Sequence, residues 1–146
     1  MLDSVAAMQG RIAMWHVLGQ SVNPLDLKSV SSNVFTDPEI ATVGYSQAEK
    51  DAGDINAEGV TLPLRTNARA KMQGVQDGFI KLFCRTGTRI VVGGVVVAPR
   101  ASELINLITL AVDHRLTVDQ LAETMTVYPS LSGSIAEAAR QLRRAK

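Results

Sequence analysis

The sequence predicts an α+β fold, in which helices pack on a mostly antiparallel sheet. Strand patterns come first and helical patterns follow them, an order typical of α+β proteins. Two strong strand patterns flank a tight turn at 86–88, which predicts a β-hairpin. An apolar helix pattern at 101–114 follows the hairpin. A chain of 146 residues with 46% hydrophobic residues is long enough to bury one domain-sized core.

The first segment, 2–19, has the periodicity of a single helix. Its apolar residues recur at spacings of three and four: Val5, Met8, Ile12, Trp15 and Leu18. Gly19 is a suitable stop for this helix, and Pro24 cannot continue it. We therefore expect residues 1–28 to be a helix and linker that belong to a different structural unit from residues 29–146.

Short strand patterns begin at residue 29. We expect strands at 30–35 and 40–45, then a short helix that opens with a capping box at Ser46 and Glu49 and closes at Gly53. The alternation of Val60, Leu62 and Leu64 predicts a half-buried strand. Pro63 places this strand at an edge of the sheet, because proline has no N–H to donate.

The hairpin strands are predicted at 79–85 and 89–97. The second strand is apolar on both faces, so we expect it at the centre of the sheet. Gly93 and Gly94 within it indicate a β-bulge or a close approach of another backbone.

The last third of the chain is predicted to be helical. Helix 101–114 is apolar nearly all round, which favours the sheet on one side and a second subunit on the other. Thr117 and Gln120 form a second capping box. A third box, Ser134 with Glu137, is expected to open the C-terminal helix, whose buried stripe is Ile135, Ala139 and Leu142.

The composition excludes several classes of function. The formal net charge is +1, without the basic excess of a nucleic-acid-binding protein. No apolar run reaches the roughly 20 residues of a membrane span, and the N-terminus does not resemble a signal peptide. Cys84 is the single cysteine, so we expect a protein of the reducing cytoplasm. We expect its thiol to be an inert core group, and we expect the chain to bind no metal ion. His16 and His114 lack neighbouring ligands and are expected at surfaces or interfaces.

Several segments, in order, resemble the dimerisation domain of the pyridine nucleotide-disulfide oxidoreductases. This family includes dihydrolipoamide dehydrogenase, glutathione reductase and mercuric reductase. The matching segments are F-T-D-P-E-I-A-T-V-G at 35–44, N-A-R-A at 67–70, G-F-I-K-L at 78–82, Gly93-Gly94, A-S-E-L-I at 101–105 and Y-P-S-L-S at 128–132. The first segment is the most specific, and the set covers essentially the whole chain.

This resemblance implies a homodimer and the cofactors FAD and NAD(P)H. The helix at 2–19 resembles the one that directs its N-terminus at the flavin, which here would be Leu2, Asp3, Ser4, Val5 and Ala6. A positive helix end stabilises negative charge on reduced flavin. The glycine motif, the redox cysteines and the NAD(P)H domain would lie upstream, together with any choice between NADH and NADPH. We therefore do not expect this chain alone to hold FAD or to be active.

One departure from the family pattern bears on the chemistry. Disulfide reductases of the family carry H-P-T-x-x-E, whose His and Glu serve the partner's dithiol as an acid-base pair. Here Tyr128 precedes Pro129, and Gly133 stands at the Glu position. The segment resembles most closely the lipoamide-dehydrogenase-like NAD(P)H:quinone reductases, which implies a quinone-like acceptor.

The resemblance leaves alternatives open for Tyr128 and for the chain. Tyr128 could form a wall of the quinone or flavin pocket, with its carbonyl accepting from flavin N3 and Pro129 beside it. Alternatively its ring is buried at the subunit interface with its hydroxyl satisfied. The chain could act as a non-catalytic homodimerisation module, or as the tail of a dihydrolipoamide dehydrogenase-like disulfide reductase.

Overall fold

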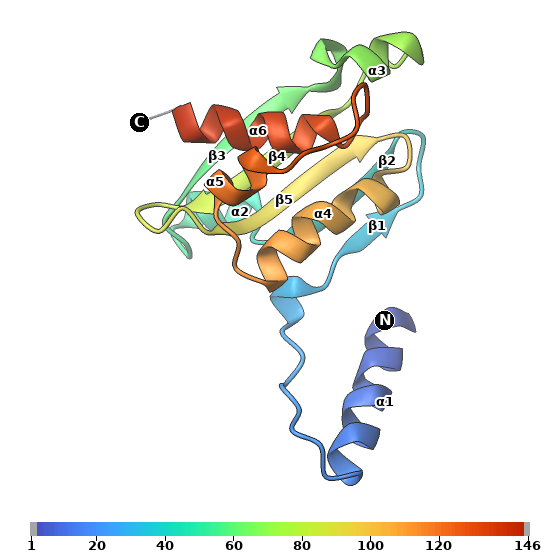
Figure 1. Ribbon diagram of the computed structural model, residues 1–146, viewed down its shortest axis with the longest axis vertical. Helices are drawn as coiled ribbons and strands as arrows, with labels where there is room; N and C mark the ends of the chain where they lie inside the picture. The colour runs from blue at the N-terminus through green and yellow to red at the C-terminus, as the bar shows by residue number, and fades with distance from the viewer. Residues whose placement is uncertain (1–2, 145–146) are drawn as a thin grey trace.

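The computed structural model describes residues 3–144 and divides them into a separate helix and an α+β unit (Figure 1). Helix α1 (Asp3–Val17) is joined to the rest by an extended segment and the short 3₁₀ helix η1 (Leu27–Ser29). Gly19 adopts the left-handed conformation (φ 76°) that ends α1 as predicted. No residue of α1 is buried: Val5, Met8 and Ile12 of its apolar stripe are half-buried, and Trp15 is 40% exposed, so the rest of the chain covers the stripe only in part.

A five-stranded antiparallel sheet forms the centre of the α+β unit, which confirms the predicted fold class. Its order is β1-β2-β5-β4-β3. The strands are β1 (Ser32–Val34), β2 (Glu39–Gly44), β3 (Ala57–Pro63), β4 (Phe79–Arg85) and β5 (Val91–Ala98). The predicted central position of β5 and edge position of β3 are both confirmed. Leu64 was predicted to continue β3, but it begins a buried 3₁₀ helix, η2 (Leu64–Thr66).

The glycine pair in β5 serves both predicted purposes. The register slips between Phe83 and Cys84, so that Val92 of β5 is an extra residue. A Cβ on Gly93 would lie 2.5 Å from the carbonyl oxygen of Tyr45, and one on Gly94 would lie 2.8 Å from that of Lys81. Glycine is therefore required here because neighbouring backbone occupies the space of a side chain.

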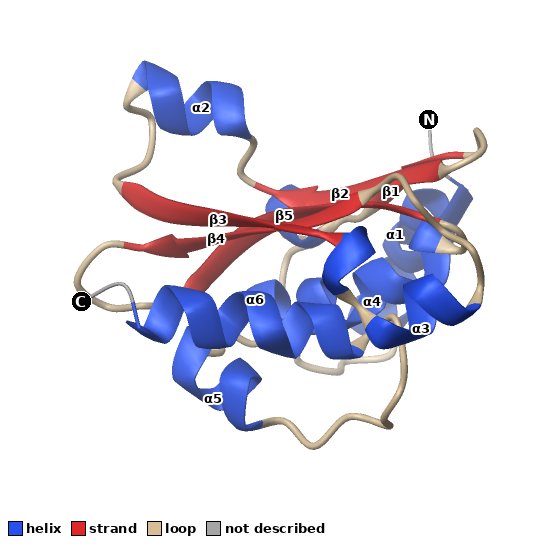
Figure 2. Cartoon of the chain, turned by 90° about the horizontal axis from the view of Figure 1, so that it is seen from above, coloured by secondary structure: helices blue, strands red, loops and turns tan. Residues whose placement is uncertain are grey.

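Helices cover the two faces of the sheet unequally (Figure 2). One face carries α3 (Ala68–Met72), α4 (Ala101–Asp113), α5 (Val118–Glu123) and α6 (Gly133–Arg144), whereas α2 (Gln47–Ala52) lies on the other side. The core lies between the sheet and the larger group of helices. Its most buried members include Ala41, Leu82, Val96, Ile105, Ile108, Ile135 and Ala139.

Two of the three predicted capping boxes are confirmed. Ser46 with Glu49 caps α2, and Thr117 with Gln120 caps α5. The third prediction is wrong, because α6 already begins at Gly133 and Ser134 is buried inside it. Ser130 accepts the Gly133 N–H at 3.1 Å instead, four residues earlier than predicted. The predicted buried stripe of α6 is confirmed.

The remaining sequence predictions concern the cysteine, metal binding and membrane spans. Cys84 is fully buried, and desolvation raises the pKa of its thiol, as expected for an inert core residue. Among residues 3–144, no cluster of three or more His, Cys, Asp or Glu side chains is arranged to hold a metal ion. Within the same residues, no helix has the length and hydropathy needed to cross a membrane.

Candidate functional site

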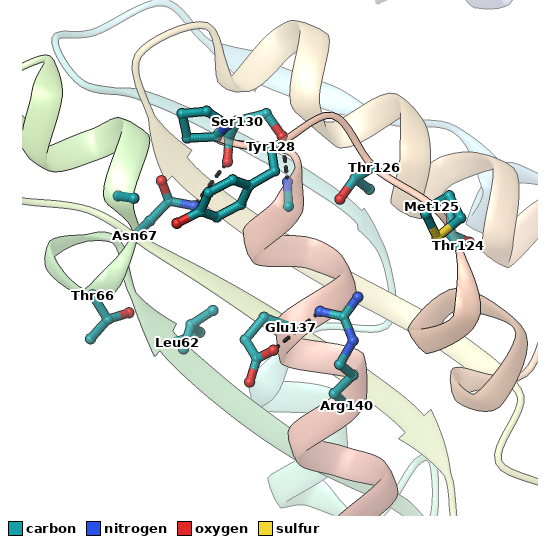
Figure 3. Close-up of a pocket in the computed structure, with 13 residues that line it drawn as sticks. Leu62, Thr66, Asn67, Thr124, Met125, Thr126, Tyr128, Ser130, Glu137 and Arg140 are labelled. Atoms are coloured by element: carbon teal, nitrogen blue, oxygen red, sulfur yellow. Dashed lines mark hydrogen bonds and ion pairs between the residues drawn. The ribbon is translucent and has the colours of Figure 1, made fainter.

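The segment 124–132, which we call the Tyr128 loop, joins α5 to α6 and borders a groove of about 410 Å³ (Figure 3). The opposite wall comes from the end of β3 and from the η2–α3 junction, through Leu62 and Asn67. Glu137 and Arg140 of α6 lie along its side and form an ion pair at 3.2 Å. The groove therefore brings residues 62–68 next to residues 124–140, two stretches that are far apart in the sequence.

The Tyr128 loop presents large apolar side chains to solvent. Tyr128 is 85% exposed, Val127 78% and Met125 95%. Such a run of exposed apolar residues on one loop is unusual for a surface that stays in water. Both alternatives for Tyr128 involve a flavin, a quinone or a second subunit, and in the single chain its side chain is exposed.

Asn67 holds the Tyr128 loop in place and uses its whole side-chain amide to do so. Its Nδ2 donates to the Ser130 carbonyl at 2.9 Å and to the Ser134 hydroxyl at 2.7 Å. Its Oδ1 accepts from the N–H groups of Arg69 at 2.7 Å and Ala70 at 3.1 Å, which caps α3. One side chain thus fastens the loop, α6 and α3 to one another.

Gly133 is the second position at which the resemblance implied a departure from the family pattern. A Cβ there would lie 3.4 Å from Ser130 Oγ and 3.5 Å from Thr126 Oγ1, which is ordinary van der Waals contact. Glycine is therefore not required by space at this position. The groove is lined by hydroxyls, one amide and one ion pair, and neither histidine lines it: His16 lies on α1, and His114 ends α4.

The predicted flavin-facing residues lie elsewhere. Leu2 is outside the described residues. Asp3, Ser4 and Ala6 are exposed, and Val5 is half-buried in a separate groove between α1 and the outer face of α4. The structure does not bring the start of α1 to Tyr128 or Pro129, because the two groups line different grooves.

The outer face of α4 is partly covered by the chain itself. Ala101, Ile105, Ile108 and Ala111 face the core, and Leu104 and Leu107 pack at its margin. Leu110 remains 51% exposed. The surface available to a second subunit on this helix is therefore narrower than the all-round apolar pattern predicted.

Glu39, within the most specific of the matching segments, has a role that the sequence analysis missed. Its carboxylate accepts the Ser102 N–H at 2.9 Å and so caps α4 from strand β2. This hydrogen bond lowers the pKa of Glu39. The N-cap residue Arg100 provides no side-chain cap of its own. Local sequence could not reveal the pair, because its members are 63 residues apart.

Comparisons with known proteins agree with this architecture. Residues 30–139 match the family model described as the pyridine nucleotide-disulphide oxidoreductase dimerisation domain. An NAD(P)H dehydrogenase (quinone) of Mycobacterium tuberculosis strain H37Rv is 62% identical over 141 residues, which are 97% of this chain and 29% of that protein. A mercuric reductase of Acidithiobacillus ferrooxidans is 39% identical over 140 residues, 96% of this chain and 25% of that protein.

The structural comparison gives the same result. The crystal structure of LpdA from Mycobacterium tuberculosis superposes with a TM-score of 0.95 at 62% identity, over 97% of this chain and 31% of that one. The chain thus spans less than a third of the length of these relatives.

Proposed function

Because this chain belongs to the pyridine nucleotide-disulphide oxidoreductases as their dimerisation domain, we propose that it forms the homodimer interface of an FAD-dependent NAD(P)H oxidoreductase with a quinone-like electron acceptor. The observation that carries this proposal is the Tyr128 loop, which is fastened by Asn67 but turns Met125, Val127 and Tyr128 to solvent. A fixed apolar loop of this kind is suited to a partner surface.

The proposed electron acceptor follows from the acid-base groups that line the groove beside the Tyr128 loop. A dithiol requires a base that accepts and returns a proton at each turnover. The groove has no imidazole, and its one carboxylate, Glu137, is engaged by Arg140. Direct transfer of electrons from flavin to a quinone requires no thiol base. The 62% identity to an NAD(P)H dehydrogenase (quinone) supports the same acceptor.

The residues present fit FAD only in part. The exposed N-terminus of α1 could face the flavin of its own subunit with its positive end, through Asp3 to Ala6. Tyr128 and Pro129 would approach the flavin of the partner subunit, where the Tyr128 carbonyl can accept a hydrogen bond. The sequence offers no glycine-rich loop for the pyrophosphate, so residues 1–28 would complete an FAD domain rather than form one.

The interface is tested by the mass of the 146-residue chain in solution. Sedimentation equilibrium is expected to show a dimer, and the double variant Val127→Ser/Tyr128→Ser is expected to weaken it at least about tenfold, because two large apolar side chains leave the interface. Leu27→Ser, at a side chain that is 69% exposed outside the loop, is the matched control. A monomeric chain, or an equal effect of the control, would contradict the interface.

The chemistry is tested on the protein isolated from its native host with an antibody against this chain. Its flavin content is measured, and NAD(P)H oxidation is followed with a benzoquinone and, separately, with lipoamide. A flavoprotein that reduces the quinone and not lipoamide is expected. Lipoamide reduction would instead support the disulfide reductase alternative, and a flavin-free product would support the non-catalytic module.

A further inference from the structure

A second groove, remote from the Tyr128 loop, lies where η1, the start of β5 and the C-terminal end of α4 meet, at the lower end of α4 in Figure 1. Its volume is about 380 Å³, which is within the range of small-molecule sites. Ile90, Val91 and Val92 provide an aliphatic floor, and the Tyr45 ring forms part of the wall. We call it the η1 groove.

Three cationic side chains line the η1 groove: Lys28 of η1, Arg85 of β4, and Arg115 of the turn after α4. Lys28 is already engaged, because its ammonium pairs with Glu49 and lies 4.4 Å from the centre of the Tyr45 ring. Arg85 and Arg115 are different. Within residues 3–144, neither guanidinium has a carboxylate partner within 4.0 Å or donates a hydrogen bond.

Arg115 is held at the groove by its backbone. It has φ 53°, in the left-handed region where a residue with a Cβ is disfavoured by about 1 kcal/mol. Its N–H donates to the Val112 carbonyl at 3.2 Å, and the next carbonyl, of Leu116, accepts from Val91 at 2.8 Å. An arginine thus stands where glycine would be less strained, on a turn that is hydrogen-bonded on both sides.

We propose that the η1 groove binds a small organic phosphate monoester, with the phosphate between Arg85 and Arg115 and the organic group against Tyr45 and the aliphatic floor. A guanidinium matches a phosphate because its planar fork donates two parallel hydrogen bonds, and two such groups match a dianion. The apolar floor favours an aromatic or short aliphatic ester over the free ion. Asp26, the one carboxylate in the lining, already accepts the Lys28 N–H at 2.9 Å.

The test is a titration of the 146-residue chain with phenyl phosphate, followed by calorimetry and by amide chemical shifts. Saturable binding is expected, with shifts concentrated at Tyr45, Val91 and Arg115. Arg115→Gly removes the cation and relieves the left-handed strain, so the fold should persist while affinity falls about tenfold or more. Arg65→Ala removes one exposed arginine outside the groove and is the matched control, with less than about a twofold effect expected.

Two comparison ligands test separately the contribution of the aromatic ring and that of the second negative charge. Inorganic phosphate should bind more weakly than phenyl phosphate because it lacks the ring, and benzoate more weakly because it carries one negative charge. No saturable binding of phenyl phosphate below about 10 mM would overturn the site. So would shifts located elsewhere, equal loss in the Arg65→Ala control, or benzoate binding as tightly as phenyl phosphate. None of these results depends on the oligomeric state of the chain.

Discussion

Asn67 both caps α3 and holds the Tyr128 loop against α6, and two substitutions of this residue can separate these roles. Asn67→Ala removes the cap of α3, at about 1 kcal/mol. It also leaves the Ser130 carbonyl and the buried Ser134 hydroxyl without their donor, at about 1 kcal/mol each. We therefore expect a total loss of about 3 kcal/mol in the free energy of unfolding. Asn67→Asp keeps both acceptor bonds to α3, and the Ser134 hydroxyl can turn to donate to the new carboxylate. The Ser130 carbonyl then faces a carboxylate oxygen in place of a donor, so we expect a loss of about 1–2 kcal/mol.

Urea unfolding gives the two free energies, and hydrogen exchange shows where each variant opens. Asn67→Asp should speed amide exchange in segment 124–132 while leaving 68–72 protected, and it should weaken dimerisation more than its small effect on stability explains. Asn67→Ala should speed exchange in both segments. Equal free energies for the two variants, or unchanged exchange at 124–132 in Asn67→Asp, would refute the view that Asn67 fixes the loop.

Further predictions concern single positions. Gly93→Ala should cost at least about 3 kcal/mol in urea unfolding, since its Cβ would lie 2.5 Å from a backbone oxygen; a loss no larger than that of Gly133→Ala would contradict this. A hydrogen bond from Lys28 lowers the pKa of Glu49 to about 2, so its stabilisation is complete above its ordinary pKa and is lost as the pH falls toward 2. The urea midpoint should therefore fall less between about pH 7 and about pH 3 in Glu49→Gln than in the unaltered chain, and equal falls would exclude this contribution. Gly10→Ala should raise the helicity of α1, measured by circular dichroism, without moving the unfolding midpoint, because α1 buries no residue; a shifted midpoint would show that α1 is coupled to the domain.

Local signals in the sequence predicted most of the fold. Period-two alternation and the tight turn located β3, β4 and β5, and two capping boxes located α2 and α5, because these patterns depend on residues within a few positions of one another. The same reasoning failed at Ser134. The Ser-x-x-Glu spacing does not reveal that the Asn67 amide donates a hydrogen bond to the Ser134 hydroxyl, which is buried.

The candidate site was predictable only as a set of positions. The resemblance pointed to Tyr128 and Gly133 as departures, and to the start of α1 as a flavin-facing end, but it did not indicate what holds them. The hydrogen bonds of Asn67 to the Tyr128 loop and α6, and of Glu39 to α4, join residues 63 or more positions apart, so no local pattern signals them. The exposure of Tyr128 likewise depends on packing around the whole loop.

The sequence by itself therefore determined the fold class, the central strand and the family, because each of these is carried by residue type, by short-range periodicity or by collinear motifs. Only the tertiary structure decided that Glu39 caps α4, that Asn67 fastens the Tyr128 loop, and that Arg85 and Arg115 line one groove without ion-pair partners among the described residues. The physical reason is that hydrogen bonds and charge pairs act over a few ångströms in space, whatever the separation along the chain.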